Sequence, residues 1–429
     1  MTVVQTIRNL TRNWAMLDQA VVSCGNFVLS FLLARWLRAP EYGAFVLIFG
    51  ILQVTNVIHQ SVISYPISVL GAQKSRAELP AFAAQSLLLT SAIDCVLAVA
   101  MALIAWYMGG TSLAVICTLA MVAVHVQETY RRTLMCHLQH RAAVAGDAVM
   151  FLGQVAGVLV VHRFFELSLE AVFFCVFVVA SLGALVQMFE VGWESQQIGA
   201  TFRNFSSFWT LGRWPLMANI GYSLTMQAFP WLLARQGLAM AASFQAVLNV
   251  VAFTNPIGSS IGNLLVPAVA HKMLLPDGAA SARKLTRKYV LIGLALLSPF
   301  LLTALIIPGK ALVLFYGAAS QYAVYTRPLQ MLAGGCGLAC ISHVAGCYFL
   351  GSKRPQIVLW SQLIGCGVAV LFAPLAMSLY GVAGAAAAFL GMGVVRLTVL
   401  ILEFRRDAGM SGGNRAVVEQ AAIRVGQGH

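Results

Sequence analysis

The tetrapeptide LLAR occurs twice in this chain, at the end of NFVLSFLLAR (residues 26–35) and at the end of MQAFPWLLAR (residues 226–235). The two copies are 200 residues apart in a chain of 429. At the same spacing, Ser23 of the first copy corresponds to Ser223 of the second. Duplication of an apolar unit predicts a protein built of two related halves.

The composition indicates that the chain lies in a membrane. Hydrophobic residues make up 60% of the sequence and charged residues 10%, and the mean hydropathy is +0.83. Soluble domains have roughly 45–50% apolar and about 25% charged residues. A helix needs about 20 predominantly apolar residues to cross a bilayer. Twelve stretches meet this length: 14–36, 43–70, 81–107, 112–130, 142–162, 167–188, 213–236, 243–271, 289–308, 325–350, 355–379 and 382–403.

We therefore expect an all-α integral membrane protein with about 12 transmembrane helices. Because both LLAR copies end odd-numbered spans, the two six-helix lobes have the same orientation, which predicts a parallel repeat with a substrate path between the lobes. The predicted parts are a cytoplasmic N-terminus (1–13), an N-lobe (14–188), a cytoplasmic linker (189–212), a C-lobe (213–404) and a mobile cytoplasmic tail (405–429).

The basic residues predict the orientation. With the N-terminus inside the cell, 20 of the 27 Lys and Arg residues lie on the cytoplasmic side, so both termini are expected in the cytoplasm. We interpret the net charge of +13 as contact with anionic lipid headgroups rather than with nucleic acid. The nine cysteines are odd in number and form no CxxC pair, so we expect neither disulfides nor a metal or other cofactor.

Polar residues recur inside four of the predicted spans at helical spacing, so each set shares one helix face. Such stripes on repeat-related helices predict a shared cavity, because transporter sites lie at repeat interfaces. The alternative is that these amides and hydroxyls join packed helices by hydrogen bonds. The stripes are Gln19, Ser23 and Asn26; Gln53, Asn56 and Gln60; Asn219, Ser223 and Gln227; and Gln245 and Asn249.

Charged residues inside spans are costly. Asp94 lies near the middle of the third span, where it is either a proton or cation site or a neutral group bonded to a neighbouring helix. Arg35 and Arg235 lie near the outer edge, where they either anchor the helices at the interface or flank the mouth of a cavity.

Four segments resemble the polysaccharide transporter branch of the multidrug/oligosaccharidyl-lipid/polysaccharide (MOP) exporter superfamily, which includes Wzx-type O-antigen flippases. The resemblance extends over roughly residues 14–404. The segments are LLARWLRAPEYGAF (32–45), QETYRRTLMCHLQHRAAVAGDAV (127–149), FWTLGRWPL (208–216) and LVLFYGAASQYA (312–323).

The resemblance implies a V-shaped central cavity lined by helices one, two, seven and eight. It also implies a flippase that moves polyprenyl-pyrophosphate-linked oligosaccharide between leaflets of a bacterial inner membrane for surface polysaccharide (O-antigen, lipopolysaccharide or exopolysaccharide). Partner enzymes would be a polymerase and glycosyltransferases. Related flippases place arginines in the cavity, but here no Arg lies in the middle of those four helices. We therefore assign the expected phosphate contacts to Arg213, Arg35 and Arg235, and ion coupling to Asp94.

Two other classes remain open. A cation-coupled drug antiporter of the same superfamily would use Asp94. A membrane enzyme acting on polyprenyl-linked sugars would need acidic residues on a sizeable outer loop, yet the outer loops are short and hold only Glu41, Glu166 and Glu170. The sequence therefore favours transport over catalysis.

Overall fold

The structure is a computed structural model of the full chain. It describes residues 3–192, 198–252, 255–275 and 278–426. Within these ranges, the side chains of some residues lie outside the described part: those of residues 3–13, 15, 16, 19, 198–204, 255, 256, 259, 263 and 408–426.

The described residues form helices and no β-strand, so the predicted all-α class is confirmed. Short 3₁₀ segments and a π-helix (Gln60–Ser64) join or continue the α-helices. The α-helices are α1 (Val3–Trp36), α2 (Ala39–His59), α3 (Tyr65–Leu70), α4 (Leu79–Cys136), α5 (His140–Phe164), α6 (Leu169–Val191), α7 (Ile198–Ala234), α8 (Leu238–Ala252), α9 (Asn255–Lys272), α10 (Gly278–Ile306), α11 (Pro308–Tyr316), α12 (Thr326–Gly351) and α13 (Pro355–Gly426).

Seven of the described helices are long and apolar enough to cross a membrane. The two longest, α4 and α13, each cover two predicted spans and contain a sharp kink. The kinks lie at Gly110 (φ 81°) and Gly381 (φ 54°), in the left-handed region that only glycine enters without strain. Each long helix is therefore a hairpin of two spans, and the chain is a multi-pass membrane protein.

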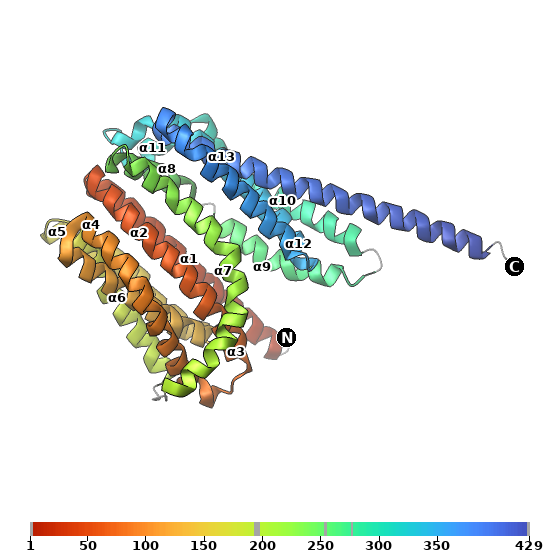
Figure 1. Ribbon diagram of the computed structural model, residues 1–429, viewed down its shortest axis with the longest axis horizontal. Helices are drawn as coiled ribbons and strands as arrows, with labels where there is room; N and C mark the ends of the chain where they lie inside the picture. Colours follow the sequence, from red (N-terminus) through yellow and green to blue (C-terminus); the bar gives the residue numbers. More distant parts are fainter. Residues whose placement is uncertain (1–2, 193–197, 253–254, 276–277, 427–429) are drawn as a thin grey trace. The chain divides into compact units, whose positions relative to one another are not determined.

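Contacts divide the chain into two compact units, Met1–Asn249 and Val250–His429. The first unit contains α1 to α7 and most of α8 (Figure 1). The predicted division into lobes at the 189–212 linker, and the predicted arrangement of those lobes, stay predictions.

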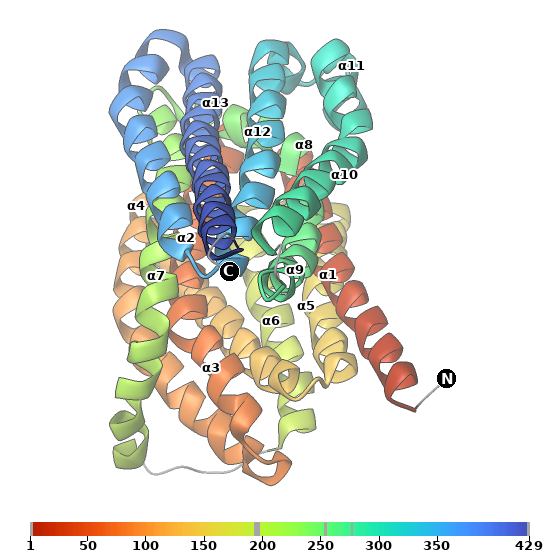
Figure 2. The same ribbon diagram turned by 90° about the vertical axis from the view of Figure 1, so that its right-hand side faces the viewer.

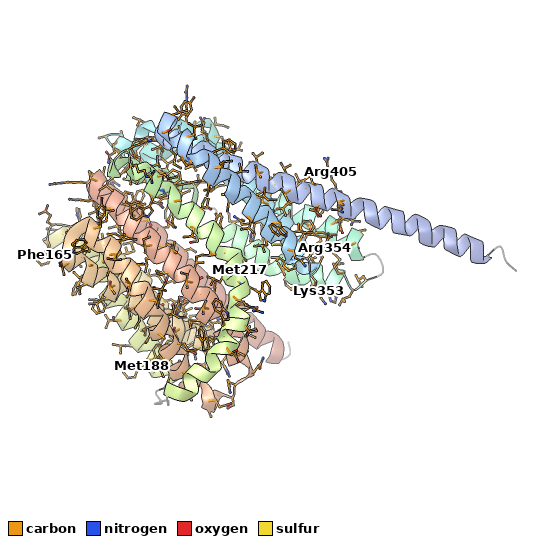
Figure 3. All side chains as sticks on the ribbon, in the orientation of Figure 1. Phe165, Met188, Met217, Lys353, Arg354 and Arg405 are labelled. Atoms are coloured by element: carbon orange, nitrogen blue, oxygen red, sulfur yellow. The ribbon has the colours of Figure 1, made fainter. Side chains whose placement is uncertain are left out.

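The first unit is a bundle in which α4 packs on α6, α6 on α5, and α5 on α1, while α7 packs on α2. Its core contains Tyr130, Leu134 and Ala143 between α4 and α5. Large apolar side chains such as Phe165 stand outward from this unit (Figure 3). Exposed apolar side chains of this kind are expected where the solvent is lipid.

In the second unit, α12 packs on α9, α10 and α13, around Val344, Tyr348 and Leu400. Figure 2 shows α10, α12 and α13 side by side. Asp407 of α13 binds Arg354 (2.9 Å), Arg283 (3.4 Å) and the Tyr348 hydroxyl. These ion pairs hold α13 against its neighbours up to the start of the predicted tail.

Candidate functional site

The first unit contains a cavity of about 570 Å³ between α2, the π-helix, α3 and α7. Most of its lining side chains are amides or hydroxyls, and one is a guanidinium. We call this space the polar cavity. Its lining residues are Gln53, Asn56, Val57, Gln60, Ser61, Ser64, Tyr65, Ser68, Arg132, Pro215, Asn219, Tyr222, Ser223, Met226 and Gln227.

The stripe on α2 reaches the polar cavity because its residues repeat at helical spacing. Asn56 donates a hydrogen bond to the Gln53 side chain (3.3 Å). After His59 the helix widens into the π-helix, and α3 follows directly, with Pro66 as its second residue. Because a π-helix adds a residue to the turn, it brings serine hydroxyls to the same space as the α2 amides, and such turns are frequent at functional sites.

The polar stripe of α7 (Asn219, Ser223 and Gln227) lies on the opposite wall, and α7 approaches α2 and the π-helix closely. A Cβ atom added to Gly50 of α2 would lie 2.7 Å from the Gln227 side-chain oxygen. A Cβ atom on Gly212 of α7 would lie 2.6 Å from the Ser61 carbonyl oxygen. Glycine at these two positions therefore allows the two walls to approach each other.

Six of the predicted cavity residues line this space together: Gln53, Asn56, Gln60, Asn219, Ser223 and Gln227. The side chain of Gln19 lies outside the described residues. The described lining does not include Ser23 or Asn26, whose helix α1 packs mainly on α5.

The predicted pair on α8 lies elsewhere in the first unit. Gln245 donates to Asn249 (2.8 Å), which donates to the Tyr42 hydroxyl of α2 (2.8 Å). These bonds join α8 to α2, as expected of amides that hold packed helices together. Whether any predicted residue contacts a substrate stays a prediction.

The three arginines predicted to contact phosphate are exposed. The Arg213 guanidinium lies over the Trp214 ring at 5.3 Å, two residues before the cavity residue Pro215. Arg35 lies in the last turn of α1, and Arg235 directly follows α7. None of the three is among the described residues that line the polar cavity.

The cation in the described lining is Arg132 of α4, which the sequence analysis did not single out. Its Nε lies 2.5 Å from Glu128 Oε1, and its side chain is 33% exposed. Because this ion pair uses Nε, the terminal guanidinium nitrogens are the donors that a ligand in the polar cavity would meet. The spacing of four between Glu128 and Arg132 was the available sequence signal.

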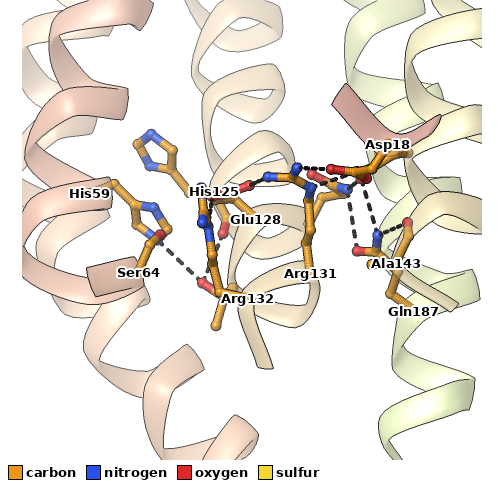
Figure 4. Close-up of polar contacts among 12 residues, drawn as sticks. Asp18, His59, Ser64, His125, Glu128, Arg131, Arg132, Ala143 and Gln187 are labelled. Atoms are coloured by element: carbon orange, nitrogen blue, oxygen red, sulfur yellow. Dashed lines mark hydrogen bonds and ion pairs between the residues drawn. The ribbon is translucent and has the colours of Figure 1, made fainter. Parts of the chain in front are cut away.

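Arg131, the preceding residue, has a different environment (Figure 4). It contacts Asp18 of α1 (2.6 Å), Glu128 of α4 (3.0 Å) and Asp147 of α5 (2.5 Å). We call these four residues the Arg131 cluster. Gln127 of α4 also donates to Asp147 (2.7 Å), as does Gln187 of α6 (3.3 Å). The cluster therefore joins α1, α4 and α5, and Gln187 links it to α6.

The predicted ion-coupling residue Asp94 is buried and lies 2.6 Å from Nδ1 of His125, on the other arm of α4. The His125 ring stacks on the His59 ring with 4.5 Å between centroids. We call Asp94, His125 and His59 the histidine cluster. Among the described residues, no group of three or more His, Cys, Asp or Glu side chains has a geometry that could hold a metal ion.

No protein-family model and no curated protein matches this chain in sequence. Its structure, in contrast, is similar to solved transporters. A lipid II flippase, MurJ, in an inward closed conformation has a TM-score of 0.69 at 12% identity, with 92% of this chain and 87% of that chain covered. The fold is that of MOP superfamily transporters.

Two further transporters support this assignment of the fold. An inward-facing multidrug resistance MATE family transporter of the MOP superfamily has a TM-score of 0.65 at 12% identity, with 92% of this chain and 96% of that chain covered. A MOP superfamily transporter from Pyrococcus furiosus has a TM-score of 0.61 at 12% identity, with 94% and 95% covered. The predicted fold is therefore confirmed, whereas the superfamily and its polysaccharide branch stay predictions.

Proposed function

We propose that this protein is a flippase that moves a polyprenyl-pyrophosphate-linked oligosaccharide from the inner to the outer leaflet of a bacterial inner membrane. The substrate would serve surface polysaccharide assembly, and no bond would be made or broken. Its head group would enter the polar cavity while the polyprenyl tail stays in lipid. Alternating access would complete the cycle.

The observation that carries this proposal is the combination of Arg132 with amide and hydroxyl groups in one cavity. A guanidinium binds phosphate oxygens through two parallel hydrogen bonds. Amides and serine hydroxyls both donate and accept hydrogen bonds, which suits the hydroxyl groups of a sugar. Such a lining favours a substrate that carries both chemistries.

The exposed arginines extend this proposal. Arg213 lies close in sequence to the cavity residue Pro215, so it would be the next cation for a phosphate that enters or leaves. Arg35 and Arg235 would act at the outer ends of α1 and α7. This assignment places both termini in the cytoplasm, where glycosyltransferases would supply the substrate, and a polymerase would receive it outside.

A cation-coupled drug antiporter is the second candidate, because a MATE family transporter shares the fold and Asp94 is a buried carboxylate. However, a cationic drug would meet Arg132 in the polar cavity, and like charges repel. The charge of the described lining therefore favours the anionic substrate.

The two candidates are separated by what cells accumulate when the gene is deleted. The flippase predicts lipid-linked oligosaccharide trapped in the inner leaflet, measured by labelling with a lectin that cannot cross the membrane. Wild-type protein should restore labelling, and the Arg132→Gln variant at equal abundance should not. Normal surface labelling in the deletion strain, together with increased sensitivity to cationic drugs, would support the antiporter instead.

A further inference from the structure

The histidine cluster is buried beside the polar cavity, and the proposed transport step does not use it. Asp94 and His125 are 3% and 0% exposed and face each other at 2.6 Å across the α4 hairpin. His59 is fully buried and stacks on His125 with an interplanar angle of 6°. His125 thus contacts both Asp94 and His59 away from solvent.

Two threonine hydroxyls allow His59 to hold or release a proton. His59 Nε2 lies 3.2 Å from both Thr90 Oγ1 and Thr129 Oγ1, which are 2.9 Å apart. Because Thr129 donates its proton to the His125 carbonyl oxygen, it can only accept from the others. Thr90 is therefore free to donate to His59 when Nε2 is bare, or to accept from it when Nε2 carries a proton.

Each member of the cluster also has one buried polar atom without a hydrogen-bond partner: Asp94 Oδ2, His125 Nε2 and His59 Nδ1. With the carboxylate ionised and both imidazoles neutral, the cluster has a charge of −1 in a dry environment. A proton on either imidazole would neutralise this net charge. The cluster thus has the groups to bind one proton.

The histidine cluster lies close enough to the polar cavity to feel the charges in its wall. His59 directly precedes the cavity residue Gln60, and the charges of Glu128 and Arg132 both act on His59 (Figure 4). These two charges oppose each other. Glu128 favours a proton on His59, whereas Arg132 disfavours it.

The other elements packed around the cluster add few charges among the described residues. On α4, Arg131 is bound to Glu128 and neutralised in turn by Asp18 of α1 and Asp147 of α5. The face of α7 on the π-helix presents Gly212 and, nearby, the apolar Phe208. Besides its own burial and the neighbouring His125, Glu128 and Arg132 are therefore the charges that act on His59.

We propose that the histidine cluster binds a proton when an anion occupies Arg132, so that anion binding and proton binding strengthen each other. An anion at the guanidinium cancels the positive charge of Arg132 and leaves the field of Glu128 at His59. Coupling of this kind is reciprocal, so protons must strengthen anion binding by the same factor. The inference rests on the proposed function only for the anionic ligand in the polar cavity.

The test measures the affinity of purified, full-length protein for inorganic pyrophosphate by calorimetry at roughly pH 6 and pH 8, on either side of the ordinary range for imidazole. The protonation of pyrophosphate itself changes between the two pH values, but this change is the same for every protein variant. The affinity ratio of each variant is therefore compared with that of the wild type. The ratio of affinities, pH 6 over pH 8, should be at least about fivefold larger for the wild type than for His59→Gln, the lower end of the usual coupling range. Asp94→Asn should behave as His59→Gln does.

The matched control is His162→Gln, which alters an exposed histidine stacked on Trp36 at the end of α5 and should keep the wild-type ratio. If His59→Gln does not elute as a folded protein, His125→Gln replaces it. Equal ratios for the wild type and a folded cluster variant, or no binding of pyrophosphate to the wild type, would overturn the inference. Equal ratios would leave the flippase proposal intact. If the protein shows pH-linked binding of pyrophosphate but moves no lipid-linked glycan, only the flippase proposal is refuted.

Discussion

Arg131 and Arg132 are adjacent in the chain and belong to the same helix, but their surroundings differ. Arg131 is 12% exposed and contacts carboxylates from three helices, whereas Arg132 is 33% exposed, contacts Glu128 and lines the polar cavity. A helix turns by about 100° per residue, so neighbours face different directions. The number of carboxylates that meet each guanidinium therefore separates a structural arginine from one that can bind a ligand.

The largest effect is expected from Arg131→Gln. Removing this cation leaves Asp18 and Asp147 buried without their counter-charge, and breaking such a pair costs about 3–5 kcal/mol. The variant should lose most of its folded protein, measured as the monodisperse fraction on gel filtration and as the apparent melting temperature. Arg132→Gln is the matched control and should melt close to the wild type. A normal melting temperature for Arg131→Gln would show that the cluster does not hold the helices together.

Arg132→Gln should change the free energy of pyrophosphate binding by less than Arg131→Gln changes the free energy of unfolding. It should nevertheless have the main effect on function. Hydrogen bonds to charged groups contribute about 1.5–3 kcal/mol, so affinity for inorganic pyrophosphate should fall by roughly 10- to 100-fold. Arg132→Lys keeps the charge but loses the paired donors, and should fall between the two. Calorimetry on detergent-purified protein measures both. Unchanged affinity in Arg132→Gln would mean that the two neighbouring arginines do not differ in the way proposed.

The comparison is sharpened by Glu128→Gln, because Glu128 is the one carboxylate that both arginines share. Without its charge, Arg132 has no ionic competitor for an anion. Ion pairs of partly exposed groups are worth about 0.2–1 kcal/mol, so pyrophosphate affinity should rise by at most about fivefold. The expectation fails if the same calorimetric titration shows weaker binding while the melting temperature is retained.

The smallest effect is expected from Gly50→Ala on α2, where this helix approaches α7. The new methyl group would meet the Gln227 side-chain oxygen, which is the movable end of a flexible side chain, so the melting temperature should change little. The apparent melting temperature of the purified variant, measured beside the wild type, checks this expectation. Gly43→Ala is the contrasting variant, since its methyl group would meet the Leu238 backbone and destabilise the protein.

Periodicity alone was sufficient to predict much of the fold and part of the candidate site. Apolar stretches of membrane-spanning length predicted the helices, and the stripes at Gln53, Asn56 and Gln60 and on the first helix of the second half line one cavity. Spacing along one helix fixes which residues share a face, and this does not depend on the partner helix.

Contacts between helices were harder to predict. Arg132 was not predicted as a cavity residue, because a single sequence does not show that α4 brings its end beside the π-helix. The partner of Asp94 could nonetheless have been predicted from the sequence. Asp94 and His125 are equally distant in sequence from the Gly109–Gly110 turn, as are Thr90 and Thr129. A hairpin centred on that turn places each pair side by side.

The central claim is that Arg132 in the polar cavity receives the pyrophosphate of a lipid-linked glycan. Its most direct test is the rate at which a fluorescent polyprenyl-pyrophosphate-linked oligosaccharide crosses the bilayer of vesicles containing the purified protein, measured with a quencher that cannot cross. Vesicles with wild-type protein should expose the lipid faster than protein-free vesicles, and vesicles with folded Arg132→Gln protein should match the protein-free rate. Equal rates for Arg132→Gln and the wild type, or no acceleration by the wild type, would contradict the claim.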